Sequence, residues 1–152
     1  MRTILKLFLS GILFFWTGPA FSNDNNNNNN PDAIIGTWLN ASGKGHIQIY
    51  KQGNKYFGKL VWLKEPNDEQ GNPKMDTKNP NTTLKTKPLI GSIILRDFVF
   101  DEDEWNSGRI YDPQNGKDYK CFLRLKYPKT LNVRGYIGVS LLGRTETWTR
   151  IN

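Results

Sequence analysis

The sequence is poor in the residues from which many catalytic and metal sites are built. Its 152 residues include one Cys and one His. A single Cys excludes an internal disulfide, and a single His excludes a metal centre or a catalytic pair that needs several histidines. We therefore expect no metal and no cofactor, and we predict a protein that is not an enzyme.

Alanine is also scarce, with three residues, whereas there are five Trp, six Tyr and eight Phe. Aromatic side chains favour the pleated, half-buried surface of a β-sheet. The composition, with 37% hydrophobic and 23% charged residues, is that of a globular protein. A chain of this length fits one domain of ordinary size. The composition thus favours a single all-β domain.

The first 22 residues have the pattern of a signal peptide. Arg2 and Lys6 precede an apolar run over residues 7–16, and Ala20 and Ser22 supply the small side chains that a signal peptidase recognises. The apolar run is shorter than the roughly 20 residues that a membrane-spanning helix needs. We predict a cleaved signal peptide over residues 1–22, a secreted protein, and no transmembrane segment after cleavage.

Residues 23–31 are rich in Asn, with six in a row from Asn25. The segment has no apolar side chain to bury, so nothing would offset the conformational entropy lost if it became ordered. We predict a disordered linker over residues 23–31 and a folded domain over residues 32–152. The formal net charge is +7, and cleavage of the signal peptide removes the positive charges of Arg2 and Lys6. The remaining modest excess of positive charge can serve solubility or attract an anionic partner.

Short apolar runs separated by turn residues dominate the rest of the chain, a pattern typical of an antiparallel meander. We predict strands over residues 34–40, 46–52, 55–63, 105–111, 119–126, 130–137 and 144–151, and a further one in the second half of residues 89–100. For residues 89–97 both strand and helix remain open. Closing about eight antiparallel strands removes the sheet edges, so we expect an up-and-down β-barrel.

Alternation within these strands predicts which side chains are buried. Ile47 and Ile49 share one face of their strand, with His46 on the other. Cys121 lies on the apolar face of its strand and is expected to be buried, and Leu131, Val133 and Ile137 are expected to share a face.

The last predicted strand has a mixed pattern. Arg144, Glu146, Trp148 and Arg150 alternate with three threonines. Two interpretations stay open for the charged face: an exposed ladder of ion pairs, or polar groups inside a barrel.

Two segments between strands carry many charges. Residues 64–87 contain Pro, Gly and nearly balanced charges and form a long loop, which is either a lid or binding loop or a mobile connection. The acidic run over residues 101–104 lacks the ligand spacing of a calcium loop and is interpreted as a solvated turn.

Several motifs carry a resemblance to known families. Gly36-Thr37-Trp38 near the start of the domain, with Arg150 near its end, resembles the pattern of lipocalins and fatty-acid-binding proteins, in which an early Gly-x-Trp packs on a late basic residue and closes the barrel base. The longer runs Gly108-Arg109-Ile110-Tyr111-Asp112-Pro113, Val133-Arg134-Gly135-Tyr136-Ile137-Gly138 and Leu142-Gly143-Arg144-Thr145-Glu146-Thr147-Trp148-Thr149-Arg150 are similar to the small exported bacterial proteins grouped as domain of unknown function 2147. This resemblance implies a lipocalin-like barrel in the periplasm or outside the cell, and no established activity.

The hypothesis we favour is an exported, non-enzymatic barrel that binds a small, partly apolar or amphipathic ligand in its interior. Its candidate lining residues are aromatic or basic, and a guanidinium could meet an acidic head group. They are Trp38, Trp62, Tyr111, Arg134, Tyr136, Arg144 and Trp148. Trp38 and Arg150 are the candidate pair for barrel closure.

Other functions remain open. The chain could be a cell-envelope interaction module that binds a protein or an anionic polymer through its basic surface and the 64–87 loop. An enzyme that uses Asp112 and Glu146 as a carboxylate pair ranks below it, because nothing in the sequence fixes their separation. Binding of nucleic acid is not expected of an exported protein.

Overall fold

The computed structural model describes residues 29–126 and 128–152. The predicted signal peptide and most of the predicted linker lie outside this part of the chain, as does Tyr127. The described residues form one short 3-10 helix and eight strands. They are η1 (Pro31–Ile34), β1 (Gly36–Leu39), β2 (Gly45–Gln52), β3 (Lys55–Leu63), β4 (Ile93–Asp101), β5 (Glu104–Asp112), β6 (Lys117–Lys126), β7 (Thr130–Tyr136) and β8 (Gly143–Arg150).

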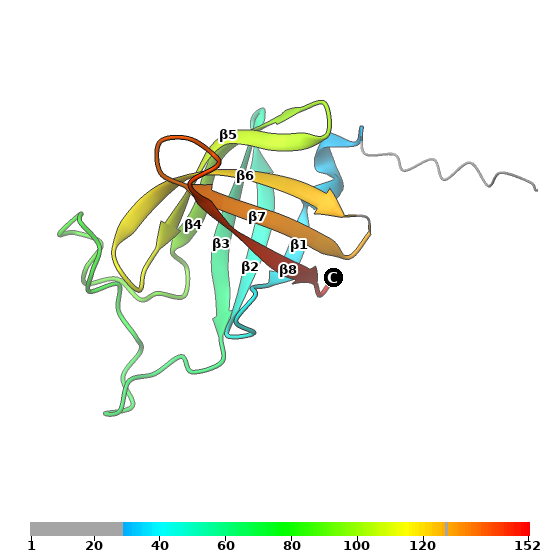
Figure 1. The fold of residues 1–152 in the computed structure, drawn as a ribbon. Coiled ribbons are helices and arrows are strands. Elements are labelled where there is room, and N and C mark those ends of the chain that lie inside the picture. The colour runs from blue at the N-terminus through cyan, green and yellow to red at the C-terminus, as the bar shows by residue number, and fades with distance from the viewer. Residues whose placement is uncertain (1–28, 127) are drawn as a thin grey trace, which may run out of the picture.

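The eight strands close into a barrel (Figure 1). Each strand pairs antiparallel with its neighbours in sequence, and β8 returns to β1, where Arg150 lies opposite Trp38 and Thr149 opposite Leu39. Closure satisfies the backbone groups that a free sheet edge would leave unpaired. The predicted all-β, antiparallel up-and-down barrel is confirmed.

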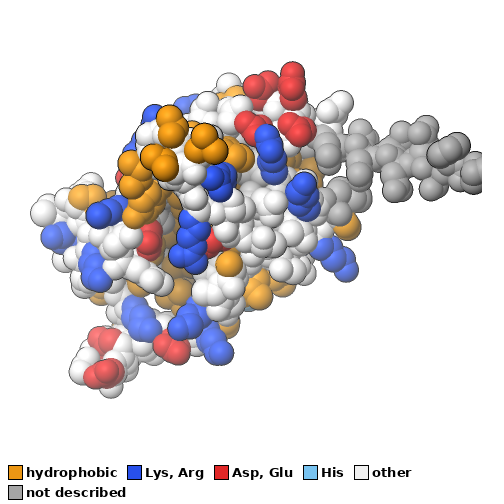
Figure 2. Space-filling model, viewed as in Figure 1, with side chains coloured by type: hydrophobic (Ala, Val, Ile, Leu, Met, Phe, Trp, Pro, Cys, Tyr) orange, Lys and Arg blue, Asp and Glu red, His pale blue; other side chains and the backbone are white. Residues whose placement is uncertain are grey.

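The barrel has two different ends. One end carries the connections over residues 40–44, 64–92, 113–116 and 137–142, and we call it the loop end. The opposite end, which we call the base, carries η1, three short turns and the C-terminus (Figure 1). The acidic turn between β4 and β5 lies at the base, whereas hydrophobic side chains gather over the β7–β8 connection at the loop end (Figure 2).

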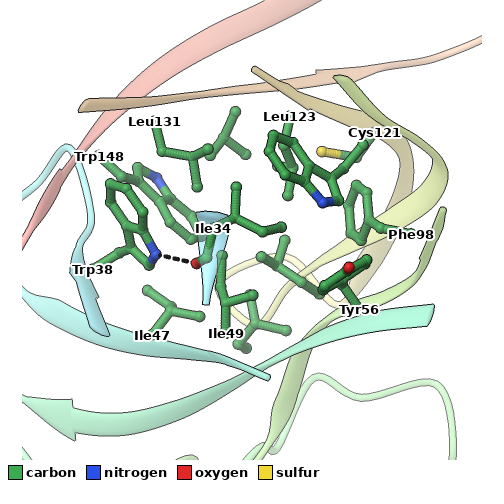
Figure 3. Close-up of a cluster of buried hydrophobic side chains, with 14 of the residues drawn as sticks. Ile34, Trp38, Ile47, Ile49, Tyr56, Phe98, Cys121, Leu123, Leu131 and Trp148 are labelled. Carbon is green, nitrogen blue, oxygen red and sulfur yellow. Dashed lines mark hydrogen bonds between the residues drawn. The ribbon is translucent and has the colours of Figure 1, made fainter. Parts of the chain in front are cut away.

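The base is filled by side chains around η1 (Figure 3). Ile34 is completely buried there among Trp38, Trp105 and Trp148. The indole N–H of Trp38 donates to the backbone oxygen of Ile34 at 2.9 Å, and that of Trp105 donates to the backbone oxygen of Pro31 at 2.9 Å. These bonds satisfy the indoles, which would otherwise be buried without a partner, and they fix η1 as a plug.

Arg150 closes the base from the side of the last strand. Its guanidinium carbon lies 4.2 Å from the centre of the Trp38 ring. The same guanidinium donates to the backbone oxygens of Ile35 at 2.9 Å, Pro128 at 3.1 Å, and Ala33. Arg150 therefore ties the start of the domain, the β6–β7 turn and β8 together, with the cation stacked on an indole face.

The predicted alternation is confirmed for the strand centres. Ile47, Ile49 and Cys121 are buried in the core, and His46 is partly exposed on the other face. Two predictions at strand ends are wrong. Ile34 belongs to η1 and not to the first strand, because Pro31 and the capping side chain of Asn30 start a helical turn there.

The second error concerns Ile137, which we placed at the end of a strand. β7 ends at Tyr136, and Ile137 is exposed in the β7–β8 connection. The stretch over residues 89–97, for which strand and helix were both open, contains the start of a strand and no helix. β4 begins at Ile93, and residues 89–92 belong to the connection from β3.

Candidate functional site

A cavity of about 630 Å³ lies between the β3–β4 connection and the barrel wall, and we call it the wall cavity. Ten of its lining residues come from the connection and four from the strands β4, β5 and β6. They are Asp76, Asn79, Pro80, Asn81, Leu84, Lys87, Pro88, Ile90, Gly91 and Ser92 from the connection, and Ile93, Arg96, Tyr111 and Asp118 from the strands.

The register places the wall cavity outside the barrel. Successive side chains of a strand point to opposite faces, and Arg96 follows Leu95, which is buried in the core. Asp118 lies three positions before the buried Cys121, so it faces away from the interior. Tyr111 pairs with Asp118 and shares its face. The cavity is therefore roofed by the long connection and is separated from the barrel interior by the sheet.

Asp76 forms the most buried polar group of the cavity, with 3% of its surface exposed. One carboxylate oxygen accepts a hydrogen bond of 2.6 Å from the Tyr111 hydroxyl, and the other accepts one of 2.7 Å from the side-chain amide of Asn79. A buried carboxylate needs such donors to offset the loss of water. Burial, together with the Asp76 carboxylate, raises the pKa of Tyr111 far above its ordinary value, so the phenol keeps its proton and remains a donor.

Arg96 and Asp118 form a second fixed polar group. Two hydrogen bonds of 2.8 and 2.7 Å join the guanidinium to the two carboxylate oxygens. The paired geometry is the strong, bidentate arrangement of these two groups. The bond to Asp118 raises the pKa of Arg96, which stays charged. Because Arg96 is on β4 and Asp118 is on β6, the pair bridges over β5 and holds the wall of the cavity in shape.

The exposed part of the cavity lining, which forms its mouth, contains the aliphatic side chains of Leu84, Ile90 and Ile93 together with Asn81 and Lys87. The site thus combines aliphatic side chains at its opening with hydrogen-bonded polar groups beneath them. Sites for small molecules are lined in this way, mostly apolar with a few fixed polar groups that set the orientation of the ligand.

The connection that roofs the cavity is fastened at several points. The Lys78 ammonium donates to the backbone oxygen of Gln114 at 2.6 Å, and the Gly91 amide donates to the backbone oxygen of Leu60 on β3 at 2.7 Å. Gly116, with a φ of +71°, lies so close to Lys78 that an added Cβ would sit 2.0 Å from the Lys78 backbone oxygen. Residues 74–92 thus pack on the barrel as a roof over the cavity.

The structure does not bring the seven predicted ligand-binding residues together. Tyr111 lines the wall cavity, whereas Trp38 and Trp148 are buried in the core. Trp62 is partly exposed and stacks on His46, with 4.1 Å between the ring centres.

The other three predicted residues lie on the last two strands. Arg134 donates to the Ser140 backbone oxygen, the ring of Tyr136 lies 6.3 Å from that of Phe122, and the exposed side chain of Arg144 forms an ion pair of 3.5 Å with Glu146.

The charged face of β8 turns inward. Glu146 lies opposite Val133, which is buried in the core, and Trp148 lies opposite the buried Leu131. The indole N–H of Trp148 donates to Glu146 at 3.4 Å. Both interpretations of this strand hold in part, because Glu146 is a polar group on the inner face while its partner Arg144 is exposed at the loop end. The other member of the suggested carboxylate pair, Asp112, accepts a bond of 2.9 Å from the Gln114 amide within its own turn.

Sequence reasoning missed Asp76, Arg96 and Asp118 as members of one site. Arg96 and Asp118 are 22 positions apart and Asp76 and Tyr111 are 35 apart, so neither pairing has a local signal. The available signal was weak: Asp118 and Tyr111 flank the same turn and are on the face of the hairpin opposite to Cys121.

Over the residues that the structure describes, no group of three or more His, Cys, Asp or Glu side chains is placed to hold a metal ion. Within the same residues, no helix has the length and apolar character needed to cross a bilayer.

The closed eight-stranded barrel, with a 3-10 helix and a Trp–Arg pair at its base, defines a lipocalin-like protein. Residues 36–150 match the model of DUF2147, a family described as an uncharacterized protein conserved in bacteria, and the chain belongs to this family. Among solved structures it is similar to protein HP1028 from the human pathogen Helicobacter pylori, which belongs to the lipocalin family. The two share 18% identity with a TM-score of 0.69, over 78% of this chain and 83% of that chain. No curated protein matches the chain.

Proposed function

We propose that this protein is an exported, non-enzymatic, lipocalin-like binding protein that holds a small, partly apolar molecule in the wall cavity. Three observations support this: the pattern of a signal peptide over residues 1–22, a lipocalin-like fold, and a cavity that combines aliphatic side chains with hydrogen-bonded polar groups. Export to the periplasm or the extracellular space is part of the proposal and rests on the sequence.

The observation that carries the proposal is the location of the space that could hold a ligand. The base of the barrel is packed with Ile34, Trp38, Trp105 and Trp148, all of them buried. The wall cavity, by contrast, has a volume of about 630 Å³. Small-molecule sites span roughly 300–1,000 Å³. We therefore place the ligand under the β3–β4 connection rather than deep in the barrel.

The side chains suggest how a ligand would lie. Its apolar part would contact Leu84, Ile90 and Ile93 at the mouth. A polar acceptor group, such as a carboxylate, would approach Arg96, which uses two N–H groups on Asp118 and has five in all. The Asp76–Tyr111 bond would keep the floor rigid, which lowers the ordering cost of binding. The ligand class is thus a small amphipathic molecule.

Two measurements test the proposal. Native mass spectrometry of the protein purified from its own host should show a bound small molecule. Titration with two environment-sensitive dyes, the anionic anilinonaphthalene sulfonate and the neutral N-phenylnaphthylamine, should give saturable binding to the purified protein. Leu84→Trp, which fills the mouth, should weaken dye binding about tenfold or more. Val61→Trp, at an exposed aliphatic residue of β3 outside the cavity lining, is the matched control.

A further variant separates the wall cavity from the barrel interior. A Cβ at Gly135 would lie 3.4 Å from Ile110 and 3.7 Å from Tyr119, so Gly135→Val occupies interior space near the loop end. We expect dye binding to survive this change. Loss of binding in Gly135→Val but not in Leu84→Trp, with both variants folded, would move the ligand into the barrel and refute the wall-cavity assignment. Absence of a bound molecule and of dye binding would refute the function itself.

A further inference from the structure

The β7–β8 connection, residues 137–142, exposes four large aliphatic side chains, and we call it the apolar loop. Ile137 is 68% exposed, Val139 60%, Leu141 88% and Leu142 74%. Among the residues described by the structure, the other exposed large hydrophobics reach at most 48%. The four side chains form a continuous apolar projection at the loop end (Figure 2). Scattered single apolar residues are normal on a protein surface, but a cluster of this kind marks an interaction site.

The backbone of the apolar loop is held by bonds of its own. The Arg134 guanidinium donates to the Ser140 backbone oxygen at 2.9 and 2.6 Å and to that of Leu141 at 3.4 Å. The Leu142 amide donates to the backbone oxygen of Val139 at 3.0 Å. Backbone groups without partners oppose entry into an apolar medium. Here several backbone oxygens of the loop already accept hydrogen bonds within the protein, so moving the loop out of water costs less free energy.

Basic side chains flank the loop. Arg134 and Arg144 lie on the two strands that the loop connects. The Arg144 side chain forms an ion pair of 3.5 Å with Glu146 and is still 84% exposed. Lys120, which is exposed, lies opposite Tyr136 at the end of β7. The connections of the loop end hold six Lys and four Asp or Glu, whereas the base carries the acidic run over residues 101–104. The excess of positive charge at the loop end favours approach of that end, rather than the base, to an anionic surface.

We propose that the apolar loop inserts into the interface of an anionic lipid membrane, with Arg134 and Arg144 beside the headgroup phosphates. The exposed hydrophobic side chains of this six-residue loop are all aliphatic, whereas protein interfaces are enriched in aromatic residues and form broader faces. The aliphatic side chains of the loop suit the acyl region of a membrane, and the basic side chains beside the loop suit its anionic headgroups. This inference does not depend on the wall cavity or on the proposed ligand.

The first experiment is co-sedimentation of the purified protein with vesicles. Binding is expected to vesicles of phosphatidylcholine with phosphatidylglycerol and to be much weaker with phosphatidylcholine alone. The double variant Leu141→Ser and Leu142→Ser should reduce partitioning about tenfold or more, because the two most exposed side chains of the loop no longer favour burial. The matched control is Val61→Ser with Ile151→Ser, which removes two exposed aliphatic side chains elsewhere.

A charge variant tests the basic border. Arg144→Gln should weaken binding to anionic vesicles severalfold at low salt, with the difference reduced at high salt. Lys129→Gln, in the β6–β7 turn at the base, carries the same change in net charge and should bind as the unmodified protein does.

A fluorescent label reports insertion directly. The single cysteine of the chain, Cys121, is buried, so Ser140→Cys offers one reactive thiol in the loop. An NBD label at position 140 should shift to shorter wavelength and brighten with anionic vesicles. The same label on Asp103→Cys, in the exposed turn at the base, should not respond.

Three outcomes would overturn the inference: no binding to anionic vesicles, binding that the loop variants leave unchanged, or an NBD label that stays in water while the protein is bound. Light scattering tests the competing explanation, which is that the loop forms a contact between two copies of the chain. We expect a monomer. A dimer that dissociates in the Leu141→Ser and Leu142→Ser double variant would support the dimer contact instead.

Discussion

The Tyr111 hydroxyl donates a 2.6 Å hydrogen bond to the Asp76 carboxylate, and both residues are buried although they are 35 positions apart. Tyr111 is on the outer face of β5, and Asp76 is in the connection that roofs the wall cavity. This bond joins the longest irregular segment of the domain to the barrel. It fastens the roof together with the bond from Lys78 to Gln114.

Tyr111→Phe should loosen the roof. The Asp76 carboxylate would lose one of its two side-chain donors while remaining buried, which costs about 1–3 kcal/mol of unfolding free energy. Denaturant unfolding measures the loss, and limited trypsin digestion should cut faster at Lys74, Lys78 and Lys85. Tyr50→Phe, at a ring that stacks on Phe57 at the barrel surface, is the matched control. Equal trypsin rates in both variants would show that the bond does not hold the roof.

The plug at the base predicts a contrast between two adjacent residues. Ile34 is completely buried against the barrel interior, whereas Ile35 is exposed. Ile34→Ala should leave a cavity and cost about 2–5 kcal/mol. Ile35→Ala should cost less than about 1 kcal/mol, because its side chain loses little burial. Thermal or denaturant unfolding of the two variants measures the difference, and similar values would contradict the role of η1 as a plug.

Arg150 should not be replaceable by Lys. An ammonium group keeps the charge but cannot stack flat on Trp38 and reach three backbone oxygens at once. Arg150→Lys is expected to lower the unfolding free energy by about 1–3 kcal/mol. Arg144→Lys, on the same strand with an exposed side chain, should change it by less than about 0.5 kcal/mol. If Arg150→Lys is as stable as the unmodified protein, stacking does not close the base.

The thiol of Cys121 predicts a decline in stability at high pH. Burial raises the pKa of Cys121 far above its ordinary value of 9.0. In the unfolded chain the thiol would ionise near that ordinary value, so its contribution is fully present below pH 9.0 and is lost as the pH rises further. Between about pH 8 and about pH 9.5 the loss should reach about 1 kcal/mol.

Cys121→Ala isolates this contribution, because the variant should show a shallower decline over the same pH range whatever its absolute stability. A thiol reagent should react with the folded protein only slowly and with the denatured protein at once. A fast reaction under native conditions would place the thiol at the surface and contradict the prediction.

The parts of the fold that follow from local patterns could be predicted from the sequence. Residues 55–63 alternate and end at turn residues, and they form β3 with those bounds. Cys121 was expected in the core because its neighbours at two-residue spacing are apolar, and it is buried. Trp38 and Arg150 are far apart in the chain, but the family resemblance linked them, and they lie opposite each other.

The candidate site could not be predicted, because it depends on where the long connection folds. Charge balance and Pro content identify residues 64–87 as a loop, but they do not say which side of the barrel the loop covers. Arg96 was in a stretch whose structure was open, and its partner Asp118 lay between the strands predicted over residues 105–111 and 119–126. The apolar loop was missed for a simpler reason: Ile137 continues the alternation of Leu131 and Val133, yet the pairing of β7 with β8 ends at Tyr136.

The plug also fixes where both ends of the domain leave the barrel. Pro31 is bonded to Trp105 inside the base, and the backbone oxygen of Asn152 accepts a bond of 3.1 Å from the Thr37 amide on the first strand. An affinity tag fused at the C-terminus would therefore attach the protein to a sensor chip by the base of the barrel. The wall cavity and the apolar loop would then face the analyte, so one immobilised preparation can be assayed with small molecules and with vesicles alike.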